Sequence, residues 1–493
     1  MKRKTVWTTL LTTILIFCCV FSSVAYASES TISLQESLVE PIDWSILPAA
    51  DSKGVLDDPS NKGTGSLEAT LEEMRYSAKR NKSKENELKY AGIQLLEELL
   101  GRQFESYKTG ELIDTSDIFL PSNSTSLYNQ YLYWYTGLIE ATQEYWTEYD
   151  FDLRFDSISG NELTFSADLS YGRTCSKYRS EQTNFPYVIA VSSDGEKYYI
   201  SDIDTTEPNF YGFMNLASDN DVEETRGILR SGSITPISKR ELDQLISEYA
   251  DFKSACRASA VDPGKVEDME TSHEVYLKAT EGAKANDKTK SLSATSYSYE
   301  RERGRTYADQ YYSNANACFY DATNDGGDCT NWVSQCVWAA YGGWTDGDDQ
   351  ATMAANIAAR KRMQPSTSLD NWFGHVNGLG NPWCGVGNFW NFVTSSPATG
   401  PKANGFNDGK VWSGNFVSTD IVTGQVLQVH KKTQTNYKHS VYVTGGTNDA
   451  FENIKITQHT PNNRIMLDEF IRNWGSSSCY VRQLKFTSAY FNS

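Results

Sequence analysis

The stretch "NDGGDCTNWVSQCVWAAYGG", from Asn324 to Gly343, predicts a helix that begins at a cysteine and runs through a protein core. Asp328 is placed to cap this helix, and the glycine pair at its end is placed to terminate it. Apolar and cysteine side chains recur three and four positions apart, which is the pattern of one buried helix face. These residues are Cys329, Trp332, Val333, Cys336, Val337 and Ala340. Cys329 therefore stands first on the buried face.

The position of Cys329 allows three interpretations: a small core residue, half of a disulfide, or a nucleophile. Only the thiolate is nucleophilic, and the partial positive charge of a helix N-terminus favours the thiolate. The carboxylate of Asp328 opposes it, so a nucleophilic Cys329 needs a positive partner, usually histidine. From this block alone, a buried or paired cysteine is the first interpretation, and Cys336 on the same face supports it.

Two histidines are candidates for that partner. His439 opens the apparent strand "KHSVYVTGG", which follows a strand at about residues 424–430, and His459 ends the apparent strand "NIKITQHT". Thr457 and His459 share one face of their strand. Two neighbouring strands thus each offer a histidine near an end, where a general base and its orienting partner can lie side by side. The alternative for each is a hydrogen-bonded histidine at a sheet edge.

Five blocks follow one another in the order seen in a known family. They are "YERERGRTYADQYY", "GGDCTNWVSQCVWAAYGG", "FWNFV", "KHSVYVTG" and "ITQHTPNNRIMLDEFI". On these blocks, residues 298–493 resemble the family described as "Putative amidase domain" of Gram-positive bacteria. That family is similar to papain-like cysteine hydrolases and to CHAP-type cell-wall amidases. The chain departs from it where the family often has Gly-Asp before the strand of the first histidine, because Gly424-Gln425 stands here.

The resemblance implies an α+β, papain-like fold in which the cysteine-bearing helix packs on an antiparallel sheet. It implies Cys329 as the nucleophile and His439 as the base, with His459 or Asn462 as the third member. The N–H of Cys329 would help to hold the oxyanion, and His439 would protonate the leaving amine. We expect no cofactor and no metal, since the compact C-x-x-C and H-x-x-x-H spacings of zinc sites are missing.

The predicted function is therefore a cysteine-dependent amide hydrolase, acting on a peptide or a peptidoglycan-type amide. The alternative is a non-catalytic exported module that binds surface glycans or peptides. The 12 Trp and 29 Tyr residues of the chain would suit stacking on sugars.

The start of the chain predicts export. Residues 1–27 carry basic residues, a short apolar run and the small-x-small site Ala25-Tyr26-Ala27, which is the pattern of a secretory signal peptide. We expect a secreted protein, with association to the cell wall as one option. No later run approaches the ~18 apolar residues of a membrane helix, so no membrane segment is expected after signal cleavage. The formal charge of −18 argues against nucleic acid as a partner.

Composition divides the rest of the chain. Residues 28–85 are polar and predict a flexible leader, and the charged, small-residue stretch 256–297 predicts a linker. Between them, residues 86–255 predict an α+β accessory domain of helices on a curved sheet, resembling cystatin-like modules. Its helices are expected within residues 85–107 and 127–149, followed by hairpins around Gly160-Asn161 and Asp194-Gly195.

Seven cysteines remain after signal cleavage, and an odd number suggests that one thiol stays free. We expect that thiol to be Cys329. Pairing within domains would join Cys175 to Cys256. The other four allow three connectivities, and they are Cys318, Cys336, Cys384 and Cys479. The competing expectation is that all seven remain reduced and the buried ones act as small apolar residues.

Overall fold

The structure is a computed structural model that describes residues 84–217, 236–259, 294–322, 328–365, 367–411, 416, 418–475 and 479–492. The predicted signal peptide, nearly all of the predicted leader and most of the predicted linker lie outside the described residues. Among the described helices, none is long and apolar enough to cross a membrane.

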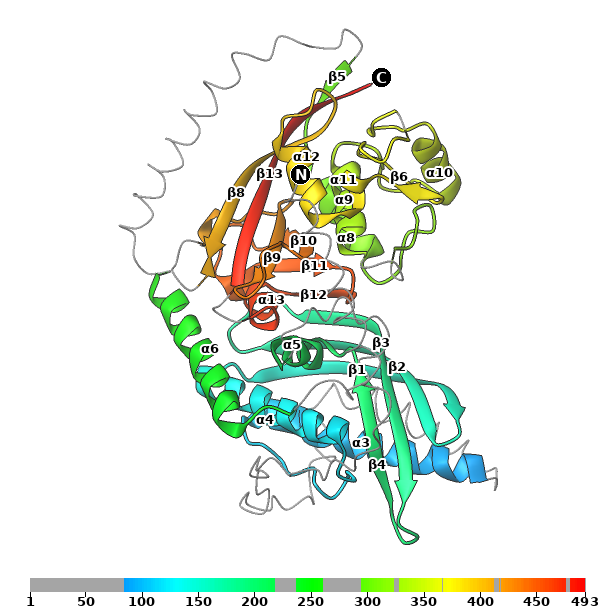
Figure 1. Cartoon of the computed structure of the whole chain (residues 1–493), viewed down its shortest axis with the longest axis vertical. Coiled ribbons are helices and arrows are strands. Elements are labelled where there is room, and N and C mark those ends of the chain that lie inside the picture. The colour runs from blue at the N-terminus through cyan, green and yellow to red at the C-terminus, as the bar shows by residue number, and fades with distance from the viewer. Residues whose placement is uncertain are drawn as a thin grey trace, which may run out of the picture. The chain divides into compact units, whose positions relative to one another are not determined.

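The predicted fold class is confirmed as a mixed α/β fold with a large antiparallel sheet. The sheet joins eleven of the described strands, in the order β1-β2-β3-β12-β11-β10-β9-β13-β5, with β4 beside β3 and β8 beside β13. Every pair of neighbouring strands in it is antiparallel. The sheet runs through both the N-terminal and the C-terminal half of the described chain (Figure 1).

The N-terminal half consists of helices packed on four strands. In chain order these are α3 (Lys84–Thr109), α4 (Asn123–Thr142), β1 (Trp146–Ser159), β2 (Glu162–Arg173), β3 (Ser180–Ser193), β4 (Tyr198–Thr205), α5 (Pro208–Ala217) and α6 (Lys239–Ser259). Both predicted hairpin turns are confirmed, one between β1 and β2 and one between β3 and β4. The predicted helix of residues 127–149 was wrong at its end. Gln143 adopts φ 59°, which ends α4, and Trp146 already belongs to β1.

The C-terminal half alternates helices with the remaining strands. These are β5 (Ala294–Tyr297), α8 (Arg301–Tyr311), α9 (Cys329–Ala340), α10 (Gln350–Ala358), β6 (Gly374–His375), β7 (Gly378–Leu379), α11 (Asn381–Cys384), α12 (Val386–Thr394), β8 (Gly400–Lys410), η6 (Ser418–Asp420), β9 (Val426–Lys431), β10 (His439–Gly445), η7 (Phe451–Asn453), β11 (Lys455–Gln458), β12 (Asn463–Met466), α13 (Leu467–Asn473) and β13 (Cys479–Asn492).

Helix α9 confirms the prediction made from its sequence. It begins at Cys329, it ends before a glycine pair, and all 12 of its residues are buried. Asp328 occupies the N-cap position without making a side-chain cap hydrogen bond, because its carboxylate serves other partners.

Different helices cover the two faces of the C-terminal strands. On β10, Tyr442 packs into a core with residues of α9, whereas Val441 and Val443 pack into a second core with Phe470 of α13. We call these the cysteine-helix face and the α13 face. The second core also contains residues of β1 to β4, so the two halves of the described chain share one hydrophobic core.

Candidate active site

Cys329 lies at the start of α9 against the sheet. Its side chain is buried, and its Sγ lies 3.7 Å from Oγ1 of Thr330. The Thr330 hydroxyl in turn lies 2.9 Å from the Ser440 hydroxyl on β10. Gln428 of β9 donates from Nε2 to Ser440 Oγ and to the carbonyl of Val386, at 3.0 Å each. This chain of polar contacts fixes the N-terminus of α9 against two strands and the start of α12.

His459 lies at the same end of α9. Its Nδ1 is 2.8 Å from Oδ2 of Asp328, and its Nε2 is 3.0 Å from the carbonyl oxygen of Tyr311. Its ring stacks on Trp332, with centroids 4.9 Å apart. Each ring nitrogen of His459 therefore faces an oxygen atom that can accept a hydrogen bond. His459 therefore borders the residue before Cys329 and the helix turn after it.

The contact between Asp328 and His459 was not predicted from the sequence. The second carboxylate oxygen of Asp328, Oδ1, accepts from Asn331 Nδ2 at 2.6 Å and from the backbone N–H of Ala322 at 3.3 Å. Its backbone N–H donates to Thr460 Oγ1 at 3.4 Å. From the sequence, Asp328 was considered only as a cap that opposes the thiolate. In the structure it joins the His459 turn to the start of the cysteine helix.

His439 lies on the opposite side of the sheet from Cys329. It starts β10 and points to the α13 face, where its ring stacks on Trp474 with centroids 5.1 Å apart and lies 6.2 Å from the ring of Phe470. Its Nε2 is 2.7 Å from Oε1 of Gln458, the last residue of β11. The structure therefore does not bring His439 and Cys329 together.

Asn462, the alternative third residue, lies in the turn between β11 and β12. Its backbone carbonyl accepts from the N–H of Thr183 on β3, at 3.4 Å. Gln458 has a better-defined role, because its Nε2 donates to Oδ1 of Asn463 at 2.8 Å while its Oε1 contacts His439. Pairing the faces of adjacent strands could have suggested the Gln458–His439 contact from the sequence.

The cysteines whose side chains the structure describes are free thiols. They are Cys175, Cys318, Cys329, Cys336, Cys384 and Cys479. The expected pairing of Cys318, Cys336, Cys384 and Cys479 is not present, and the side chain of Cys256 lies outside the described residues. Burial raises the pKa of Cys336 well above its usual value, and that of Cys479 to about 12. These two thiols are poor nucleophiles near neutral pH.

Cys384 lies near the candidate nucleophile, at the end of α11. This short helix is tied to α9, because Trp383 donates from Nε1 to Asn331 Oδ1 and accepts at its carbonyl from Ser334 Oγ, both at 2.7 Å. Burial raises the pKa of Cys384, and the negative charge of a Cys329 thiolate raises it further.

One group of side chains has the spacing of a cation site but does not fit one. Glu144, Cys175 and Asp468 offer ligand atoms within 4.8 Å of one another. Arg173 already binds Asp468 at 2.8 Å, and Lys253 binds Glu144 and Asp468 at 2.7 and 2.9 Å. The carboxylate charges are therefore compensated by protein cations.

A cavity of about 190 Å³ opens on the outer face of β1 to β3, beside Tyr312. Its carboxylates are paired with arginines: Asp150 with Arg179, Asp152 and Asp168 with Arg154, and Glu181 with Arg464. Each of these carboxylates therefore already has an arginine as its partner.

A comparison with known protein families gives a match that covers part of the C-terminal half. Residues 298–482 match the model of the family described as "Putative amidase domain". The matched range includes Cys329, His439 and His459. No curated protein and no solved structure gave a significant match to the chain.

Proposed function

We propose that residues 298–482 hydrolyse amide bonds through a thioester formed on Cys329. The family match indicates an amidase-type domain. The observation that carries the cysteine mechanism is the position of Cys329 as the first residue of a buried helix, at the helix end that also holds the Asp328–His459 pair. A helix N-terminus favours the thiolate, and a neighbouring histidine with an orienting carboxylate is the usual partner of a catalytic cysteine.

In this mechanism the thiolate of Cys329 attacks the amide carbonyl and forms a tetrahedral oxyanion. The first N–H groups of α9, which have no partner within the helix itself, are suited to stabilise that charge. The C–N bond then breaks, the leaving amine takes a proton from the histidine, and water hydrolyses the thioester.

The contacts of the two histidines favour His459 over His439 as that acid and base. Asp328 at Nδ1 is the arrangement that orients a catalytic imidazole, and Nε2 would exchange the Tyr311 carbonyl for the thiol. His439 is better suited to position His459, because it forms a hydrogen bond with Gln458, the residue before His459. The papain-like relationship and the base role of His439 stay predictions.

The compartment and the substrate are proposed from the sequence. The signal-peptide pattern of residues 1–27 supports secretion, and secretion in a Gram-positive bacterium gives access to cell-wall peptides. We therefore propose peptide or peptidoglycan-type amides as the substrate class.

The test is incubation of the mature chain with purified cell wall and a peptide panel, with new amines identified by mass spectrometry. Cys329→Ala should lower hydrolysis by about 1000-fold or more, because it removes the covalent nucleophile. Cys384→Ala is the matched control, since it removes the neighbouring thiol and should leave hydrolysis intact. Near wild-type hydrolysis by a folded Cys329→Ala variant would refute the mechanism. Cell-wall binding without new amines would favour the non-catalytic module.

A second comparison separates the histidines. His459→Gln should lower hydrolysis by about 100-fold or more, as expected for loss of a general acid–base group. His439→Gln should cost less, about tenfold, because its effect passes through Gln458. The reverse order would return the base role to His439.

A further inference from the structure

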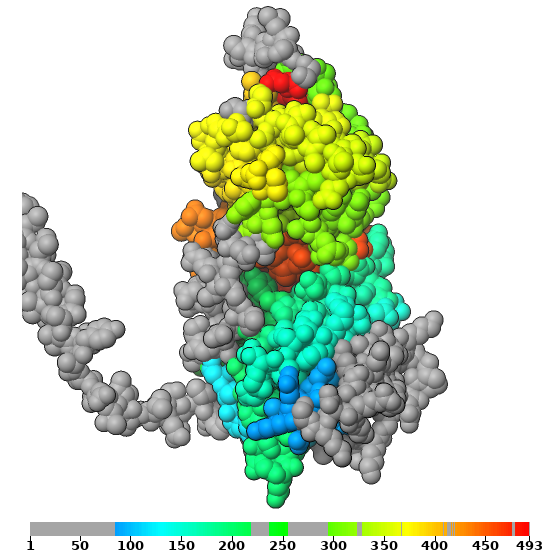
Figure 2. Space-filling view, turned by 90° about the vertical axis from the view of Figure 1, so that its right-hand side faces the viewer, coloured from blue at the N-terminus to red at the C-terminus, as the bar shows by residue number. Residues whose placement is uncertain are grey.

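The turn that carries His459 is supported by the N-terminal half of the described chain. We call residues 455–466, which comprise β11, the turn and β12, the His459 hairpin. On its outer edge β12 pairs with β3, with Asn463 opposite Gln182 and Arg464 opposite Glu181. In Figure 2 the orange-red surface of the hairpin lies between the light green surface of the α8 region and the cyan-green surface of β1 to β3. Without β3, β12 would be an unpaired sheet edge.

A cluster on the cysteine-helix face reinforces this short pairing. Arg464 of β12 binds Glu181 of β3 at 2.6 Å and Asp309 of α8 at 3.0 Å. Its guanidinium lies 3.9 Å from the ring centre of Tyr312, whose hydroxyl donates to Glu181 at 3.3 Å. Tyr312 follows directly after Tyr311, whose carbonyl contacts His459. Glu181 therefore helps to fix both the strand after His459 and the segment that holds its ring.

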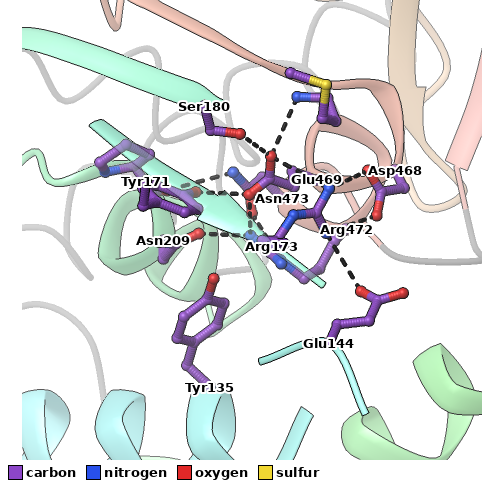
Figure 3. Close-up of polar contacts among 12 residues, drawn as sticks. Tyr135, Glu144, Tyr171, Arg173, Ser180, Asn209, Asp468, Glu469, Arg472 and Asn473 are labelled. Carbon is purple, nitrogen blue, oxygen red and sulfur yellow. Dashed lines mark hydrogen bonds and ion pairs between the residues drawn. The ribbon is translucent and has the colours of Figure 1, made fainter. Parts of the chain in front are cut away.

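A second cluster, buried on the α13 face, ties α13 to the same N-terminal strands (Figure 3). Glu469 accepts from the hydroxyls of Tyr171 and Ser180, and from the N–H of Met466 at 3.1 Å. Since Met466 ends β12, this carboxylate connects the hairpin to β2 and β3.

Asp468 extends this cluster with charges. It receives two hydrogen bonds of 2.8 Å from Arg173 and one of 2.9 Å from Lys253. Burial by itself would raise the pKa of Asp468. The charges of Arg173 and Lys253 outweigh burial and hold the pKa below its usual range. Both cations come from the N-terminal half, so the ion-pair partners of Asp468 in the described part of the chain lie outside residues 298–482.

Other residues of α13 contact a histidine next to the candidate active site. Phe470 and Trp474 pack against the ring of His439, and His439 contacts Gln458 immediately before His459. Contacts on both faces of the sheet therefore connect the N-terminal half to His459: the Glu181 cluster on the cysteine-helix face and α13 with His439 on the other face.

We infer that the described part of the N-terminal half, residues 84–217 and 236–259, positions His459 for the reaction, with Glu181 as a positioning residue outside the family-matching segment. This inference rests on the proposed function of His459. It assigns to the N-terminal half a part in catalysis, although its own side chains do not touch the reacting atoms.

The experiment uses the full mature chain with Glu181→Ala, Glu181→Gln and the matched control Asp150→Ala. Asp150 also pairs with an arginine on the same sheet face, but the hydrogen bonds of this Arg179 within the described chain go to Glu148, Asp150 and Ser170 of the N-terminal half. Glu181→Ala should lower kcat by about tenfold with little change in KM, because a displaced catalytic group loses orientation rather than substrate binding. Glu181→Gln keeps an acceptor for Arg464 and should restore most of kcat. Asp150→Ala should match the wild type.

Two readouts do not depend on turnover: the pH profile of iodoacetamide alkylation at Cys329, and amide hydrogen exchange of residues 455–466. Glu181→Ala should shift the profile and speed the exchange. Wild-type kcat, profile and exchange in Glu181→Ala would overturn the inference. If Cys329→Ala still hydrolyses amides, the proposed function fails, and hydrogen exchange still decides whether the N-terminal half holds the hairpin.

Discussion

Replacing Arg173 by methionine should destabilise the whole described unit, because this arginine is the main partner of a buried carboxylate. Its side chain is 3% exposed and makes two 2.8 Å hydrogen bonds to Asp468. Removing one partner of a buried ion pair costs about 3–5 kcal/mol of unfolding free energy. Lys253 remains 2.9 Å from Asp468, so we expect the lower end, about 3 kcal/mol.

Arg154 provides the matched control. It binds Asp168 at 2.9 Å on the same sheet, but its side chain is 41% exposed. Exposed pairs contribute about 0–1 kcal/mol, so Arg154→Met should stay within about 1 kcal/mol of the wild type.

The assay is urea unfolding of the mature chain, followed by tryptophan fluorescence and circular dichroism. Because the two halves share one core, both probes should report one transition that shifts as a whole in Arg173→Met. The double variant Arg173→Met/Asp468→Leu should recover part of the loss, since it also removes the carboxylate that Arg173 binds at the shortest distance. A loss below about 1 kcal/mol, or two transitions of which only one shifts, would refute the reasoning.

Three further predictions concern acid, thiols and packing. The pKa of Asp468 is lower in the folded state than in the unfolded state, so its contribution to stability is complete above the ordinary carboxyl range and is lost on acidification through the lowered pKa. The urea concentration at the unfolding midpoint should therefore fall below about pH 4. The fall should be smaller in Arg173→Met/Asp468→Leu, which lacks this carboxylate. Iodoacetamide near neutral pH should label Cys329 in native protein, whereas Cys336 and Cys479 should react only after unfolding, because burial raises their pKa. Peptide mapping that finds Cys329 in a disulfide in active protein would contradict its role as the nucleophile. Gly304→Ala should cost about 1–3 kcal/mol, because a Cβ there would lie 2.1 Å from the Tyr442 hydroxyl and 3.0 Å from the Cys336 carbonyl. Gly387→Ala, where no atom lies within 4 Å, is its control in the same unfolding assay.

Local patterns predicted the elements that carry the candidate site. Helix α9 starts at Cys329, as its capping residue and buried stripe indicated. β10 starts at His439, and His459 follows the last residue of β11. These features depend on residues a few positions apart, so one sequence contains the necessary information.

Contacts between distant segments were not predictable in the same way. The β3–β12 pairing consists of two residue pairs, and Arg464 and Glu181 in it are 283 positions apart, without a turn that would set the register. The charges of α13 are buried against Arg173 and Lys253, whose positions in the sequence resemble those of ordinary surface cations.

The assignment of the two histidines shows where strand patterns stop being informative. Alternation correctly places His439 with Val441 and Val443, and His459 with Thr457. It does not say which helix each set meets, because both faces of this sheet are buried and apolar residues occur on both. Which helix each histidine meets is shown by side-chain contacts between neighbouring strands and with the helices.

One of those contacts extends the cysteine-helix face from β10 to β11. The hydroxyls of Thr444 and Thr457 lie 2.8 Å apart, and on β10 Thr444 has the same parity as Ser440, which contacts Thr330 of α9. His459 follows β11 and contacts Asp328 and Trp332, so it lies on this face at the Cys329 end of α9. His439 is one position out of phase with Ser440 and lies on the α13 face, against Trp474. The order of the five sequence blocks along the chain does not by itself say which sheet face each histidine occupies. The face that a histidine occupies is therefore the stronger argument for its role, and it is the argument that the His459→Gln and His439→Gln comparison tests.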